Sequence, residues 1–312
     1  MFDTLAIFAP FLLTGLLLPR WQAVCKKVYK TPPHKKGPVG GGWLLAGVVA
    51  LTLFGLTFIP PVHFPPHLSM PIIAQFSLIS LIAIILASFY RNADKTLIAP
   101  SRFVRMMPFV FAGIGAFFMP PLLDGMGFWP ERALYVVIWL VIMRAFSKAD
   151  QLDGLAVTSA AIICFALALF VKPLTIPAMV VAGSCLGFLR FNRPDAILLL
   201  GSAGRRWLGF IVGGLWLQAA SAAPSDGQIF ALLILLMPLL VNNLFTTKPW
   251  HVRLEALGLS QKQVLARLIV AQIVALFIAV VVFVSPAPGL FLALTFVLAM
   301  LYLAYIRWLE RC

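Results

Sequence analysis

The sequence predicts an all-α integral membrane protein: a polytopic bundle of about 10–11 transmembrane helices that forms a single membrane domain over residues 1–312. Hydrophobic residues make up 62% of the chain and charged residues 11%, whereas soluble domains are nearer half apolar and a quarter charged. Apolar runs of spanning length recur along the whole chain. The basic residues concentrate in alternate loops between these runs, which is typical of membrane proteins.

Eleven apolar runs are long enough to cross a bilayer. The first has no basic segment before it and no small-residue cleavage site, so we interpret it as a span rather than a signal peptide. The fifth is short, and its helix is compatible with a start near Phe128. The Lys172-Pro173 break makes residues 156–190 either a hairpin or one bent element. The runs lie at about residues 4–19, 43–60, 70–89, 103–121, 133–146, 156–172, 174–190, 207–223, 228–245, 264–284 and 288–306.

The loops predict the orientation. Of the 24 Lys and Arg residues, all but Arg132 and Lys172 fall in alternate loops or in the C-terminal tail. The positive-inside rule assigns these loops to the cytoplasm, so the N-terminus is expected outside and the C-terminus in the cytoplasm. The net charge of +14 is then mainly a topology signal, and no nucleic acid partner is expected, because the loops lack groove-reading motifs. The cytoplasmic loops lie at about residues 20–42, 88–105, 144–156, 190–207 and 246–264.

Acids and cations gather in the third cytoplasmic loop, where Arg144, Lys148, Asp150 and Asp153 lie between two apolar runs. Charges beside membrane segments are costly, so a cluster of them indicates a function. If the segment is helical, the two acids share one face because they are three residues apart. A plainer interpretation is a helix-terminal charge cluster, since acids near a helix start are favourable.

Motifs occur in all five cytoplasmic loops: HKKGPVGGG at 34–42, FYR at 89–91, RAFSKADQLDGL at 144–155, FNRP at 191–194 with GSAGRRWLGF at 201–210, and PWHVR at 249–253. In this order they resemble the superfamily of polyprenyl-phosphate N-acetylhexosamine-1-phosphate transferases. That superfamily includes the bacterial phospho-MurNAc-pentapeptide translocase and the GlcNAc-1-phosphate transferase of surface-glycan synthesis. The resemblance extends over nearly the whole chain.

The resemblance implies a multi-pass protein of the bacterial inner membrane that moves a sugar-1-phosphate from a UDP-sugar to undecaprenyl phosphate, with Mg²⁺ as cofactor. It identifies Asp150, Asp153 and His251 as catalytic candidates, and the two aspartates also as metal ligands. A homodimer or a partner membrane protein is further implied. The candidates for substrate or phosphate binding are Lys35, Lys36, Arg91, Arg144, Lys148, Asn192, Arg205, Arg206 and Arg253.

Several positions depart from the family's pattern. Phe89 and Tyr90 stand in place of a paired aspartate, and Ser202 in place of a metal-binding aspartate. Arg144 and Ser147 replace two asparagines, and only His251 remains of about three histidines, whereas the glycines and prolines of the motifs are kept. A hydroxyl is a poor substitute for a carboxylate on Mg²⁺, so the departures leave metal binding open.

The replacements also shift the charge of the site toward positive. Arg144, Lys148, Arg205 and Arg206 are interpreted as standing where the charge of the metal would lie, since arginine binds phosphate bidentately without metal.

Three functions therefore compete. The first is a catalytically degenerate homologue that binds polyprenyl phosphate or a nucleotide sugar and acts as a regulator, carrier or subunit. The second is a working transferase with a divergent or metal-poor site. The third is a structural or transport-type subunit. Transport requires polar residues or broken helices near the bilayer midplane, and the spans offer only Gln75, Gln218 and Gln272 there. We favour the first, because losing the acid pair and the glycine-loop aspartate together is hard to offset.

Overall fold

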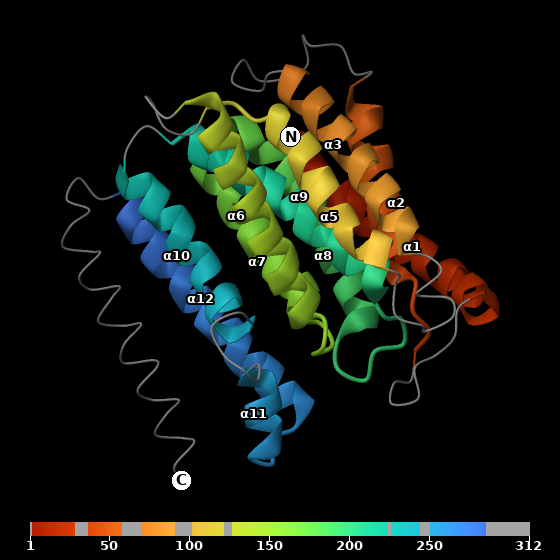
Figure 1. Ribbon diagram of the computed structural model, residues 1–312. Coiled ribbons are helices and arrows are strands. Elements are labelled where there is room, and N and C mark those ends of the chain that lie inside the picture. Colours follow the sequence, from red (N-terminus) through yellow and green to blue (C-terminus); the bar gives the residue numbers. More distant parts are fainter. Residues whose placement is uncertain are drawn as a thin grey trace.

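A computed structural model describes residues 2–28, 37–57, 70–90, 102–121, 127–223, 226–243 and 250–284 of the chain. These residues form a helical bundle in which neighbouring helices run side by side (Figure 1). Among them the only β pairing is an isolated parallel bridge between Val39 and Leu199. The helices are α1 (Phe2–Val28), α2 (Gly41–Leu56), α3 (Met70–Phe89), α5 (Arg102–Phe117), α6 (Phe128–Ala149), α7 (Leu155–Phe170), the 3₁₀ turn η2 (Lys172–Leu174), α8 (Thr175–Asn192), α9 (Gly201–Ser221), α10 (Asp226–Asn243), α11 (Trp250–Ala256) and α12 (Gln261–Val284).

Three of these helical segments are both long enough and apolar enough to cross a membrane. They are Ala6–Val28, Lys172–Asn192 and Gln261–Val284. Five shorter apolar helices accompany them within the described residues. The prediction of an all-α membrane protein is confirmed at this level. The predicted span at 288–306 lies outside the described residues.

Several helices extend beyond the predicted apolar runs. α1 continues past Pro19 to Val28, so the predicted loop at 20–42 begins nine residues too early. The residues after Pro19 continue the helix because Trp21 and Cys25 pack against the core. α6 begins at Phe128, the earlier of the two starts considered. α9 begins at Gly201 rather than near 207, so that Arg205 and Arg206 are helical.

The break at Lys172-Pro173 is resolved as a hairpin. α7 ends at Phe170, η2 makes the turn, and α8 returns beside α7 (Figure 1). Thr175 stabilises the turn by donating its hydroxyl to the carbonyl oxygens of Ala168, at 3.1 Å, and Lys172, at 2.8 Å. The hairpin matters for the site because it returns the chain to the end of the bundle where α6 finishes.

Glycines allow the closest helix contacts, as is common in membrane bundles. A Cβ added to Gly183 of α8 would lie 2.2 Å from the Ile7 carbonyl oxygen of α1, and one added to Gly187 would lie 2.6 Å from that of Phe11. α2 and α9 cross at Gly42 and Gly204, where a Cβ on the former would lie 2.1 Å from the Cα of the latter. The crossing of α2 and α9 brings together the loops that precede these two helices.

The buried part of α6 packs against α9 through Trp139. Its indole stacks on Phe210 with the ring centroids 4.6 Å apart, and its Nε1–H donates to the Phe210 carbonyl oxygen at 2.7 Å. Gly213 accommodates the indole, because a Cβ there would lie 2.6 Å from it. This contact determines how the ends of α6 and α9 face each other at the candidate site.

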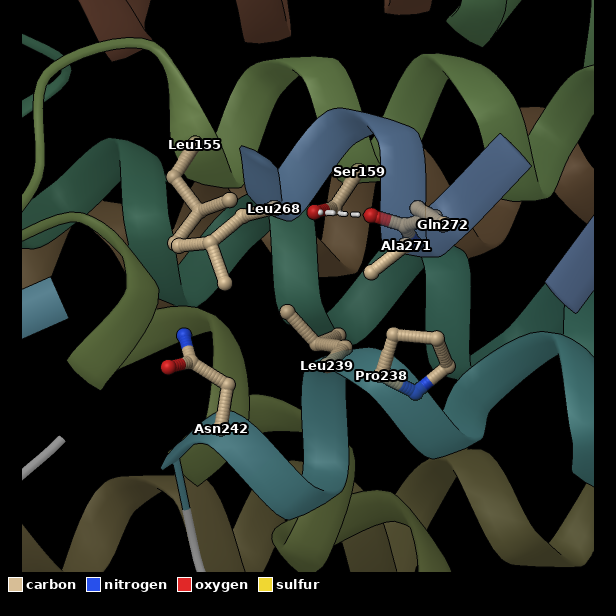
Figure 2. A pocket seen from close by; sticks show the side chains of 8 residues that line it. All are labelled: Leu155, Ser159, Pro238, Leu239, Asn242, Leu268, Ala271 and Gln272. Carbon is tan, nitrogen blue, oxygen red and sulfur yellow. Dashed lines mark hydrogen bonds between the residues drawn. The ribbon is translucent and has the colours of Figure 1, made fainter. Parts of the chain in front are cut away.

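A polar pair joins α7 to α12 inside the bundle. Ser159 donates its hydroxyl to Gln272 Oε1 at 2.7 Å, and both side chains are buried (Figure 2). They line a cavity of about 10 Å³ together with Pro238 and Asn242 of α10, which is about enough for one water molecule. Gln272, one of the three mid-span glutamines, therefore has an interhelical partner here, and this cavity is too small for a transported solute.

Candidate active site

The third-loop acids lie in a short turn between α6 and α7. α6 ends at Ala149, and the Asp150 N–H donates to the Phe146 carbonyl oxygen at 3.1 Å. α7 starts after Gly154, whose φ of 85° is a left-handed conformation that glycine adopts without strain. Residues 150–154 are not helical. Asp150 and Asp153 therefore do not share a helix face. The side chain of Asp150 is 15% exposed, and Asp153 is 4% exposed.

Asn192 connects this turn to the loop between α8 and α9. Its Oδ1 accepts the Gly154 N–H at 3.2 Å, and its Nδ2 donates to the Leu198 carbonyl oxygen at 3.1 Å. The side chain is 2% exposed. Both ends of the amide contact backbone, so Asn192 holds this turn in place, and its predicted contact with a ligand stays a prediction.

The end of the loop between α1 and α2 pairs with the residues just before α9. Gly41 N–H donates to the Leu199 carbonyl oxygen at 2.9 Å, and Gly42 N–H to that of Leu200 at 3.0 Å. Trp21 of α1 also contacts this segment, since its Nε1–H donates to the Gly40 carbonyl oxygen at 2.9 Å. The glycine-rich motif of this loop thus places the first turns of α2 and α9 side by side.

Three arginines, Arg144, Arg205 and Arg206, form what we call the arginine cluster at the ends of α6 and α9. Arg205 Nη1 lies 3.9 Å from Asp150 Oδ2. Arg206 places its guanidinium carbon 5.3 Å from the ring centre of Tyr90, a cation–π distance. Charges of Arg205 and Arg144 both act on Arg206. The α6 end, the α9 start and the residue after α3 are therefore brought together.

Tyr90 stands where the resemblance expects an acid, and it has a defined place in the site. It is 1% exposed, and its hydroxyl donates to the Val104 carbonyl oxygen of α5 at 2.9 Å. Burial raises the pKa of Tyr90, while Arg206 and Arg205 act to lower it. Burial also lowers the pKa of Arg206, which the tyrosine offsets in part. Sequence reasoning missed this pairing, because Tyr90 and Arg206 are far apart in the chain and meet only in the fold.

Two donors in the arginine cluster have no partner within the described part of the chain. The Nε atoms of Arg205 and Arg206 are buried, and neither has a hydrogen-bond partner among the described residues. Buried donors are nearly always paired in folded proteins. A bound anion is one physical explanation for the exceptions, since guanidinium N–H groups match phosphate and carboxylate oxygens.

The remaining predicted residues are distributed as follows. Lys148 is half-buried in the last turn of α6, and Ser202 is in the first turn of α9. His251, which is 2% exposed, and the partly exposed Arg253 both belong to α11. α11, the α6–α7 turn and the α8–α9 loop all lie at the same end of the bundle (Figure 1). Lys35, Lys36 and Arg91 lie outside the described residues.

The donor set fits a divalent cation poorly. Mg²⁺ prefers carboxylates and waters in octahedral geometry. Here Asp150 faces the Arg205 guanidinium, Asp153 is almost fully buried, and the position expected to be a third acid is Ser202. Across the described ranges no three His, Cys, Asp or Glu residues gather in a way that could hold a metal ion. The residues present therefore do not fit Mg²⁺.

The helical architecture and its apolar spans define an integral membrane protein of the all-α class. Comparison with known sequences then narrows the class. The model of the glycosyl transferase family 4 matches residues 67–220. This match confirms the resemblance to the superfamily of polyprenyl-phosphate hexosamine-1-phosphate transferases that the loop motifs indicated. The match includes the motifs at 89–91, 144–155, 191–194 and 201–210 but not those at 34–42 and 249–253.

The similar curated proteins are phospho-N-acetylmuramoyl-pentapeptide-transferases. That of Chlamydia trachomatis serovar L2 is 27% identical over 173 residues, which is 49% of this chain and 52% of the relative. That of Endomicrobium trichonymphae is 27% identical over 172 residues, or 46% and 48%. That of Thermosynechococcus vestitus is 35% identical over 98 residues, or 29% and 26%. The chain thus matches about half the length of the first two.

Proposed function

We propose that this protein is a catalytically degenerate member of its family that binds polyprenyl phosphate or a UDP-sugar at the cytoplasmic face of a bacterial inner membrane. The observation that carries the proposal is the arginine cluster, in which two buried guanidinium donors lack partners among the described residues. Fixed cations there would hold the phosphates of the ligand in place of a metal ion.

Charge and geometry support this choice over metal-dependent transfer. Phosphoryl transfer depends on positioning and on positive charge around the migrating group. Losing one electrostatic group costs roughly 10²–10³ in rate, and here both the paired acids and the glycine-loop acid are replaced, by Phe89, Tyr90 and Ser202. Arginine retains affinity for phosphate without supplying the chemistry of a metal.

The predicted binding residues take graded roles in this proposal. Arg144, Arg205 and Arg206 would contact the phosphates most directly, with Lys148 beside them. Lys35, Lys36, Arg91 and Arg253 would extend the positive surface toward the ligand. Asp150 would orient Arg205, with which it makes an ion pair.

A working transferase is the second candidate. It is favoured by the retention of Asp150 and Asp153 in one turn directly before α7. In this candidate the two acids and His251 would act in a divergent or metal-poor site. A multi-pass topology with the N-terminus outside, and assembly as a homodimer or with a partner membrane protein, are compatible with both candidates.

Binding and turnover separate the two candidates. Isothermal titration of the purified protein with UDP-GlcNAc and with undecaprenyl phosphate, with and without EDTA, should give binding that EDTA leaves unchanged. The R205Q/R206Q variant should bind at least about a hundredfold more weakly, since each of the two lost hydrogen bonds to a charged group costs about 1.5–3 kcal/mol. K26Q/K27Q removes the same charge from the exposed end of α1 and should bind normally.

Two results would overturn the proposal. One is affinity that disappears when EDTA removes divalent cations. The other is metal-stimulated multiple turnover of radiolabelled sugar phosphate in proteoliposomes, which would favour the working transferase.

A further inference from the structure

A groove whose lining does not include the arginine cluster lies between the end of α8 and the start of α12. Its volume is about 620 Å³, within the range of ligand sites in proteins. Arg190 and Arg193 come from α8 and the residue after it, and Lys262 comes from the first turn of α12. Asp195 is the one acid that lines the groove.

The cations of the groove are available to a ligand. Arg190 and Arg193 are exposed, and within the described part of the chain neither makes an ion pair. Lys262 is held 3.6 Å from Asp195, but its side chain is still 73% exposed. Three cations against one carboxylate leave the groove positive, so charge complementarity selects an anion.

The backbone at Asp195, which lines the groove, has an unusual conformation. Asp195 has a φ of 72°, the single left-handed non-glycine residue among those described. Aspartate tolerates this conformation better than most residues, and here it directs the carboxylate toward Lys262.

Apolar residues continue from the charged end along one face of α12. Lys262, Leu265, Ala266 and Ile269 all line the groove, and their spacing of three and four residues places them on one side of the helix. α12 is one of the three candidate spans, so this face runs from a cation at the interface into the apolar part of the helix. Phe191 and Ile197 form the opposite wall.

We propose that this groove binds an anionic glycerophospholipid of the cytoplasmic leaflet. The headgroup phosphate would contact Arg190, Arg193 and Lys262, and an acyl chain would follow Leu265 and Ile269. Basic pockets between transmembrane helices on this side of a membrane bind such headgroups. The lipid site is separate from the arginine cluster and does not depend on ligand binding there.

The groove has a direct connection to the candidate active site. A Cβ added to Gly154 would lie 3.3 Å from Leu265 and 3.4 Å from the Arg193 Cα, so two groove residues lie behind the turn that carries Asp153. A lipid in the groove would therefore stabilise the position of this turn.

Native mass spectrometry of the full chain tests the proposal. The protein is purified in detergent with equal amounts of phosphatidylglycerol, cardiolipin and phosphatidylcholine. We expect the wild type to retain the two anionic lipids over phosphatidylcholine. R190Q/R193Q should lose roughly 10- to 30-fold of that retention, since each cation near a membrane surface contributes about 1 kcal/mol. The matched control K26Q/K27Q should stay within about twofold of the wild type.

Three outcomes would overturn the lipid site: equal retention of phosphatidylcholine, an equal loss in the control, or displacement of the anionic lipid by undecaprenyl phosphate, which would assign the groove to the acceptor. If R190Q/R193Q does not fold, Ala266→Trp serves as the second variant, because it fills the groove without changing charge. It should reduce retention as much, and unchanged retention would again refute the site.

Discussion

Tyr90 illustrates at the residue scale how one side chain alters the chemistry of a site. In a family whose pattern has an acid here, the buried ring lies under Arg206 and is fixed to the Val104 carbonyl oxygen. An aromatic face attracts a guanidinium without neutralising it. The arginine therefore keeps its charge for a ligand, whereas a carboxylate would form an ion pair with it.

Replacing Tyr90 tests this interpretation. Tyr90→Asp should weaken binding of UDP-GlcNAc or undecaprenyl phosphate roughly tenfold, because a carboxylate beside Arg206 competes with the phosphate of the ligand. Tyr90→Phe keeps the ring and should bind within about twofold of the wild type. Titration calorimetry measures both variants, and tighter binding by Tyr90→Asp in the presence of Mg²⁺ would instead support a restored metal site.

Asn192 gives a prediction about stability. Asn192→Ala should lower the free energy of unfolding by about 1–3 kcal/mol, because it leaves the buried Gly154 N–H and Leu198 carbonyl oxygen unpaired. Gln22→Ala removes a more exposed bond to the same loop, at 3.3 Å to Ile197, and should cost far less. Thermal unfolding in detergent compares them; an equal loss for both would show that the Asn192 bridge has no special role.

At the scale of elements, the bundle depends on glycines at helix crossings. α1 and α8 approach so closely at Gly183 that any side chain there meets the backbone of Ile7. Gly47 of α2 is also helical, yet a Cβ added to it has open space. The two positions differ in packing but not in helix propensity.

This pair of glycines gives a matched experiment. Gly183→Ala should destabilise the protein by about 1–3 kcal/mol through overpacking, whereas Gly47→Ala should be neutral or stabilise it by about 0.5–1 kcal/mol through reduced backbone entropy. Melting temperatures in one detergent provide the comparison. If Gly183→Ala melts like the wild type, the close α1–α8 contact is not important for stability.

At the scale of the whole molecule, orientation in the membrane remains the main prediction from charge. Lys27 and Lys172 are both exposed, and they are expected on opposite sides of the bilayer. In a variant without its native cysteines, Lys172→Cys should react with a membrane-impermeant maleimide in intact spheroplasts. Lys27→Cys should react only in inside-out vesicles. The reverse pattern of labelling would invert the predicted topology.

Sequence alone determined the class and the family of this protein. Composition and run length identify the spans because a bilayer imposes its thickness on any helix that crosses it. The kept glycines and acids of the loop motifs identify the family. Helix ends were less predictable. α9 starts at Gly201, before the apolar run at 207–223, because Arg205 and Arg206 are helical and contact Asp150 and Tyr90 of neighbouring segments.

Only the tertiary structure decided which loop residues act together. That Arg206 lies over Tyr90, and that Asn192 holds the turn beyond Asp153, depends on contacts between segments 38 or more residues apart in the chain. Local sequence patterns do not show how far apart such segments lie in the folded protein. The close packing of glycine-lined helices fixes those distances, and with them the shape and charge of the site.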